Sequence, residues 1–167
     1  AELADNPFRD DWQTPYGVPP FAQIDDKDYL PAISKAIAEL RSEVAAIIEN
    51  TAAPTFANTI LALELAGASV TKVAYTFNNV TNTDSHDVLR KLETQSFPML
   101  TREFDAIVLN EALYVRVEAV FDARDDLDLD EQQARLLELT HRRFLRAGAV
   151  FAPEVKERVA QINAEIS

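Results

Sequence analysis

The sequence predicts an all-α fold, a bundle or array of about six helices. Only three glycines occur in 167 residues, whereas sheets need many turns and usually place glycine in them. Alanine, leucine, glutamate and arginine, which are good helix formers, are abundant. Apolar residues recur at steps of three and four along most of the chain, as they do on the buried face of a helix.

The first segment departs from this pattern. Four prolines and four aromatic residues lie between Asn6 and Asp26. Proline prevents a regular helix there, and so many aromatic side chains need a surface to pack against. We therefore expect residues 1–27 to form an extended arm packed on the helices, and residues 28–167 to form the helical domain.

Apolar residues at helical spacing, together with terminating residues, predict the first two helices. The first is expected over about 28–49, with Asn50 and Pro54 after it. Thr55 is a suitable N-cap for the second, and Asn78-Asn79 a suitable stop. Gly67 then lies inside this helix at a cost of about 1 kcal/mol against alanine. A close crossing by another helix is the expected reason for it.

A polar loop at 81–85 is expected to precede the third helix, capped by Ser85 or Asp84 and kinked at Pro98. A fourth helix restarts after Asn110. The fifth is expected from about Asp130 to Ala147, with Gly148 as its terminator.

The sixth helix begins near Ala152-Pro153, since proline suits a first turn. Its apolar face consists of Val155, Val159, Ile162 and Ile166. No glycine, asparagine or proline stops this stripe before Ser167. We therefore expect the chain to be a fragment of a longer protein, with an apolar face that could pair two copies in isolation.

Composition excludes several classes of protein. The formal net charge of −12 repels nucleic acid and anionic lipid, so neither is expected as a partner. The apolar runs fall short of the roughly 20 residues that cross a bilayer. The absence of cysteine excludes disulfides, thiolate metal sites and a cysteine nucleophile. It is compatible with more than one compartment; we expect the cytoplasm, with the periplasm as the alternative.

Neither histidine forms a zinc-hydrolase motif, which needs two histidines four residues apart on one helix. Arg90 follows His86 by four residues and Leu145 follows His141 by four. Both histidines are expected to be surface or capping residues. The letters of a Ser-His-Asp triad occur at 84–87, but adjacent residues cannot adopt triad geometry, and a helix start explains them better.

Two charged clusters have simple structural explanations. Asp126, Asp128 and Asp130 alternate like calcium ligands, but the turn glycine is missing and Leu137 occupies the twelfth position. A solvated loop before a helix is the better interpretation. The basic cluster at 141–146 suits a helix C-terminus, although its arginines could also contact a carboxylate-rich partner.

Five segments carry a family resemblance. They are Asn6-Pro7-Phe8 with Trp12 to Phe21, Tyr29-Leu30-Pro31-Ala32, Pro54 to Ile60, Phe77-Asn78-Asn79 with Thr81-Asn82, and Leu109-Asn110 with Leu113-Tyr114 and Arg116 or Val117. In this order they resemble the N-terminal domain of the peptidyl-dipeptidase Dcp group, relatives of oligopeptidase A and thimet oligopeptidase. Ala57 departs from the family pattern, which has an acidic residue there. The resemblance spans essentially the whole chain.

The resemblance implies a much longer, largely helical zinc metallopeptidase whose channel admits short peptides. The zinc-binding H-E-x-x-H helix and a third ligand, a glutamate, lie far downstream in such proteins. Zinc is therefore expected in the full-length parent and not in this chain, which should be inactive alone. The parent would hydrolyse peptide bonds through zinc-bound water. Release of C-terminal dipeptides and internal cleavage both remain open.

This chain would then form part of the channel wall and contact the C-terminal catalytic domain. Tyr75, Asn78 and Asn79 are the candidate substrate-channel residues, with core packing and helix capping as the alternative explanations. A second hypothesis is a stand-alone helical interaction module without catalytic activity. A stand-alone enzyme ranks third, because no spacing indicates a pocket of convergent acids.

Overall fold

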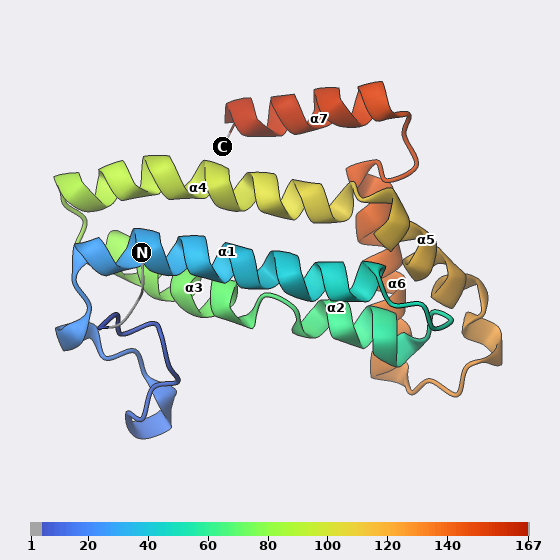
Figure 1. Cartoon of the computed structure of the whole chain (residues 1–167), viewed down its shortest axis with the longest axis horizontal. Helices are drawn as coiled ribbons and strands as arrows, with labels where there is room; N and C mark the ends of the chain where they lie inside the picture. Colours follow the sequence, from blue (N-terminus) through green and yellow to red (C-terminus); the bar gives the residue numbers. More distant parts are fainter. Residues whose placement is uncertain (1–4, 167) are drawn as a thin grey trace. The chain divides into compact units, whose positions relative to one another are not determined.

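The computed structural model describes residues 5–166, without the side chains of 153, 160 and 164–166, and no strand occurs in this part. This confirms the all-α prediction (Figure 1). The long helices are α1 (Asp26–Ile48), α3 (Ala68–Thr83), α4 (Asp87–Val108), α5 (Glu111–Asp122), α6 (Glu131–Ala147) and α7 (Pro153–Ile166). The short ones are the 3-10 turns η1 (Pro15–Gly17), η2 (Phe21–Gln23) and η4 (Arg124–Asp126), the π-helix η3 (Phe56–Leu61) and α2 (Ala62–Leu65).

The chain divides into two compact units, each made of two chain segments. Unit 1 combines the segment ending at Arg41 with Gly67–Met99. Unit 2 combines Ser42–Ala66 with the segment beginning at Leu100. Each unit has its own buried apolar side chains and is described separately.

In unit 1 the arm packs against α1 and α3 through a row of aromatic rings. Phe8 is buried, with its ring centroid 5.5 Å from that of Tyr29 on α1. Tyr29 lies 4.8 Å from Phe77 of α3 by the same measure. Polar contacts add to this packing, since Asn6 Nδ2 donates to the Asp28 carbonyl at 2.9 Å. Burial of these rings explains why a proline-rich segment is held in place without a long helix.

The second helix is broken where the sequence predicted it to be continuous. Thr55 caps η3 in a capping box with Asn58, as expected of an N-cap. Ala66, however, has an extended backbone (ψ 142°), and Gly67 has a left-handed φ of 82°. A Cβ at Gly67 would lie 3.2 Å from Leu40 Cδ1. Close packing against α1 is therefore present, but Gly67 is a break between two helices and not an interior helical residue.

The predicted stop at Asn78-Asn79 is also wrong, because α3 continues to Thr83. Thr81 is buried, so one more turn of helix covers apolar surface. The expected loop at 81–85 shrinks to residues 84–86, and α4 begins at Asp87 and not after a Ser85 or Asp84 cap. Tertiary burial overrides the weak preference of asparagine for helix ends.

The stretch Phe56–Thr83 is long and apolar enough to cross a membrane, with a mean hydropathy of 1.3 in its most apolar window. Unbroken apolar runs in the sequence are too short to indicate this stretch, because polar residues interrupt it. The stretch is not one continuous helix, because the backbone leaves the helical conformation at Ala66 and Gly67. This stretch carries little charge because α3, which makes up much of it, has Lys72 as its one charged residue.

In unit 2 the helix ends agree closely with the prediction. Asn110 accepts a hydrogen bond from the Leu113 amide and caps α5. Asp130 and Gln133 form a capping box at the start of α6. Gly148 ends α6 with a left-handed φ of 94°. Phe144 of α6 is 1% exposed and Leu113 of α5 is fully buried, so these two helices pack on a common core.

α7 lies beside the C-terminal part of α4 (Figure 1), and Asn163 Nδ2 donates to Asp105 Oδ2 at 3.0 Å. Val155 and Ile162 remain 46% and 42% exposed. The expected apolar face is thus uncovered at these two positions. Ile166 of the same predicted stripe lies outside the described side chains.

Candidate functional site

The three candidate channel residues all lie on α3. Tyr75 is 73% exposed, and Asn78 and Asn79 are exposed as well. Tyr75 is therefore not a core residue. The two asparagines lie inside the helix and do not cap it. Both of the alternative structural explanations for these residues are thus wrong.

The same exposed face of α3 includes two residues that the sequence analysis missed. Thr71 precedes Tyr75 by one turn, and Asn82 follows Asn78 by one turn; both are exposed. We call the five residues Thr71, Tyr75, Asn78, Asn79 and Asn82 the α3 stripe. Their spacing of three and four residues is visible in the sequence, but the mistaken helix end at 79 left Asn82 outside the predicted helix.

The α3 stripe carries no charge. Lys72 is the one charged residue of α3, and it is directed to the arm. Its Nζ donates to the Asp10 carbonyl at 2.7 Å and lies 4.5 Å from the centre of the Trp12 ring. In a chain with 26% charged residues, an uncharged exposed helix face is unusual.

A cavity of about 390 Å³ adjoins the C-terminal end of the stripe. Asn79 and Thr83 of α3 line it, together with Phe21 of the arm and Tyr29 of α1. His86 and Asp26 also line it, with His86 Nε2 3.5 Å from Asp26 Oδ2. The stripe therefore ends beside a hollow that has aromatic and polar walls.

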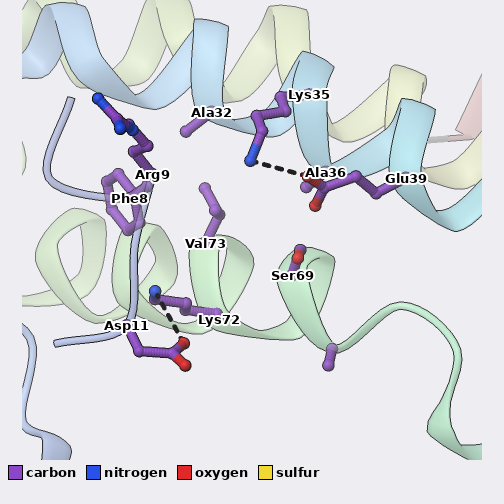
Figure 2. Close-up of a pocket in the computed structure, with 11 residues that line it drawn as sticks. Phe8, Arg9, Asp11, Ala32, Lys35, Ala36, Glu39, Ser69, Lys72 and Val73 are labelled. Carbon is purple, nitrogen blue, oxygen red and sulfur yellow. Dashed lines mark ion pairs between the residues drawn. The ribbon is translucent and has the colours of Figure 1, made fainter. Parts of the chain in front are cut away.

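A second cavity, of about 220 Å³, lies between the arm, α1 and the first turns of α3 (Figure 2). Figure 2 shows ion pairs on its two sides, Lys35 with Glu39 and Lys72 with Asp11. The Lys35 ammonium approaches Glu39 Oε1 to 2.7 Å and, with the Ser69 hydroxyl, lowers the pKa of Glu39. Because its charged groups already pair with one another, this cavity offers no free charge to a ligand of one sign.

Arg116 joins two of the segments that carried the family resemblance. It is 8% exposed, and its Nη1 donates to the carbonyls of Asn50 at 2.8 Å and Ala52 at 3.4 Å. Its Nη2 donates to Asn58 Oδ1 at 3.3 Å. Asn58 also completes the capping box of η3. This buried arginine therefore holds the 50–58 loop against α5.

His141 is half-buried, and it lies inside α6 and does not cap it. Its ring stacks on Phe121 with centroids 3.8 Å apart, and burial lowers its pKa. Beside it, burial and the hydrogen bond to Glu118 raise the pKa of Tyr114 to about 12. Packing between α5 and α6 accounts for this group.

Of the three alternating aspartates before α6, Asp130 caps the helix, as the loop interpretation expects. Among the described residues, no group of three or more His, Cys, Asp or Glu could hold a metal ion.

Comparison with known proteins shows which proteins the chain is similar to. Over 163 residues, 98% of this chain, it is 38% identical to the dipeptidyl carboxypeptidase of Salmonella typhimurium. It is 39% identical to that of Escherichia coli K12 over 96% of the chain. Nearly the whole chain is thus similar to one part of these dipeptidyl carboxypeptidases. It is 22% identical to oligopeptidase A of Salmonella typhimurium over 92% of its length. It matches no family model.

The chain spans about a quarter (24%) of the length of these dipeptidyl carboxypeptidases. The expected resemblance to a Dcp-like N-terminal region is thereby confirmed. Within this family region, the segments around Asn58 and Arg116 are in direct contact. The α3 stripe includes the asparagines of another of these segments.

Proposed function

We propose that this chain is the non-catalytic N-terminal helical region of a longer peptidase that hydrolyses short peptides. Its similarity to dipeptidyl carboxypeptidases over nearly its whole length supports the proposal. The remainder of the same polypeptide is then its permanent partner. Oligopeptidase A is a more distant relative, so internal cleavage is the competing mode for the parent.

In this proposal the α3 stripe forms part of the wall of the substrate channel. The single observation that carries this role is the exposed, uncharged and amide-rich surface at Tyr75, Asn78 and Asn79. A wall of this kind contacts peptides without selecting for charge. It would restrict entry to unfolded chains and help to orient them.

The chemical step belongs to residues outside this chain. Zinc, which the family implies, would supply an activated water in the full protein. No described group here fits that metal. This region would therefore contribute binding and orientation only, and we expect it to be inactive alone.

The test uses the full-length protein with a set of short peptides. Asn78→Ala/Asn79→Ala and Tyr75→Ala should each lower kcat/KM several-fold, because they remove wall contacts. Gln132→Ala is the matched control, since Gln132 is an exposed amide on α6. Mass spectrometry of the products separates release of C-terminal dipeptides from internal cleavage.

Unchanged turnover and products in both stripe variants would remove the channel-wall role. Absence of peptide hydrolysis by active-site-intact full-length protein would remove the peptidase assignment itself. A cytoplasmic location is a further proposal, and cell fractionation with detection of the native protein tests it against the periplasm.

A second candidate is a stand-alone interaction module that binds a partner through the exposed α7 face. Val155 and Ile162 are 46% and 42% exposed, as a dimer-forming stripe would require. Sedimentation of the 167-residue chain should then show a dimer that Val155→Asp/Ile162→Asp converts to a monomer. A monomer in the unsubstituted chain at high concentration would argue against pairing of two copies through α7, which the fragment interpretation also allows.

A further inference from the structure

The α3 stripe is poorly suited to stabilising a helix. Asparagine, threonine and tyrosine have lower helix propensity than glutamate, lysine or alanine, which usually occupy exposed positions. The helix also lacks a side-chain cap at Gly67 and acidic residues in its first turn. Its buried face, with Val73 and Phe77, holds it in place. The composition of the exposed face therefore needs another reason.

Several hydrogen-bonding groups of the stripe have no partner among the described residues. Neither the Tyr75 hydroxyl nor the Asn79 side chain makes a hydrogen bond with that part of the protein. Asn82 Nδ2 donates to the Asn78 carbonyl at 2.6 Å and to Asn78 Oδ1 at 3.1 Å. This leaves the Asn78 amide nitrogen and the Asn82 side-chain oxygen available. The stripe thus offers both donors and acceptors without charge.

These properties match the main chain of an extended peptide. Each peptide unit presents one N–H and one C=O, and a side-chain amide can bond both kinds of group. Successive stripe positions are about 5.4 Å apart, one helical turn. An extended chain presents equivalent groups on one side about every 6.6 Å, two residues. A neutral surface also complements a neutral main chain, whatever side chains the peptide carries.

The cavity at the end of the stripe gives such a peptide room to continue. Asn79 belongs to the stripe and also lines this cavity of about 390 Å³. Tyr29 and Phe21 supply apolar wall there. The main chain of the bound peptide can continue past Asn79 into this hollow.

From these observations we infer that the α3 stripe, with Asn82 as an additional binding residue, recognises the main chain of substrate peptides independently of their side chains. The inference rests on the proposed function and makes it more specific. It assigns the occupant of the stripe as an extended peptide. It predicts that removal of a main-chain donor, not a change of side chain, weakens binding.

The experiment measures kcat/KM of the full-length protein on a peptide and on analogues with one amide replaced by an ester. Each ester removes one N–H donor and changes the shape little. At one or more positions away from the cleaved bond, we expect a loss of about fivefold to tenfold, as for one neutral hydrogen bond. Changing the side chain at the same position should alter kcat/KM less than twofold.

The same peptides are then tested on Asn79→Ala, Asn82→Ala and the Gln132→Ala control. Alanine favours the helix, so the two stripe variants should fold. In one of the two stripe variants, the unmodified peptide should react about fivefold to tenfold more slowly than with the unsubstituted protein. Replacement of its amide by the ester should then cause no further loss in that variant. The control should keep the full sensitivity to the ester.

Other results overturn the inference in distinguishable ways. Stripe variants that slow hydrolysis while the ester loss stays fully additive would leave the channel-wall proposal standing and reject main-chain recognition. Variants without any effect would reject both. A stripe covered by another part of the polypeptide, or by a second copy, would give a lowered thermal midpoint in the variants and no coupling to the ester, which also rejects the inference.

Discussion

Helices α3 and α6 have nearly the same length, 16 and 17 residues, but their exposed faces differ in charge. α6 carries six charged side chains, with Glu138 paired to both Arg135 and Arg142. α3 carries only Lys72. α6 also has a capping box and a glycine C-cap, whereas the N-cap of α3 is Gly67 without a side-chain hydrogen bond. The exposed face of α6 stabilises its own helix through charge pairs, whereas the exposed face of α3 has no such pairs among the described residues.

The largest expected effect tests whether both helices depend equally on their buried faces. Phe77 of α3 and Phe144 of α6 are each 1% exposed. Replacing either by alanine should cost about 3–5 kcal/mol. Hydrogen exchange of amides in the affected helix of the full-length protein should accelerate by about a hundredfold or more. An acceleration below tenfold at Phe77 would mean that other contacts hold α3.

The second prediction exploits the exposed faces. Replacing Asn78, Asn79 and Asn82 by alanine should stabilise α3 by about 0.5 kcal/mol per residue, because alanine has the higher helix propensity. The same changes should lower peptide turnover in the full-length protein. Amide exchange measures the stability of α3, which should rise, and kcat/KM measures peptide turnover, which should fall, in the same set of variants. Destabilisation together with lost turnover would show that the stripe is structural.

The third prediction concerns the side-chain N-cap of α6, a feature that α3 lacks. Asp130→Ala should destabilise α6 by about 1 kcal/mol, since its carboxylate accepts from the Gln133 amide. Circular dichroism of a synthetic peptide covering residues 127–148 measures the loss of helicity. Asp128→Ala, which removes the same charge from the preceding loop, is the control. Equal losses in the two peptides would indicate a charge effect and not capping.

The smallest effect is a pH dependence restricted to α6. The hydrogen bond from Arg135 lowers the pKa of Glu138 below its usual value of 4.5. A carboxylate with a lowered folded-state pKa stabilises the helix above the unfolded value and loses this contribution as the pH falls through the folded value. The 127–148 peptide should therefore lose helicity as the pH falls from about 5 to 3.

A peptide of residues 67–83 carries no acidic side chain and should show no such change. Glu138→Gln in the α6 peptide should reduce the pH dependence of helicity. If that variant retains the full dependence, other acids at the N-terminus of α6 are responsible.

Helix identity and most helix ends could be predicted from local signals. Asn110, Asp130 and Gly148 act where the sequence placed them, because caps depend on side chains within a few residues. The errors occur at Gly67 and Asn78-Asn79, where distant contacts decide. Leu40 packs against Gly67, and buried Thr81 extends the helix by another turn.

The candidate site was only partly predictable for the same reason. Tyr75, Asn78 and Asn79 could be selected by residue type and family resemblance. Whether they were core, caps or exposed depended on where α3 ends and which side it buries. Asn82 was missed because the predicted helix stopped before it. The contact of Arg116 with Asn58 joins residues far apart in the sequence, so no local pattern indicates it.

By itself, then, the sequence determined the all-α class, the caps of α5 and α6, the resemblance to part of the dipeptidyl carboxypeptidases and the low charge of the segment that forms α3. Only the tertiary structure decided that α3 is separate from α2, that it runs to Thr83 and that its uncharged residues form one exposed face. Capping and periodicity are properties of neighbouring residues. Which face of a helix is exposed depends on which residues from other parts of the chain pack against its opposite face.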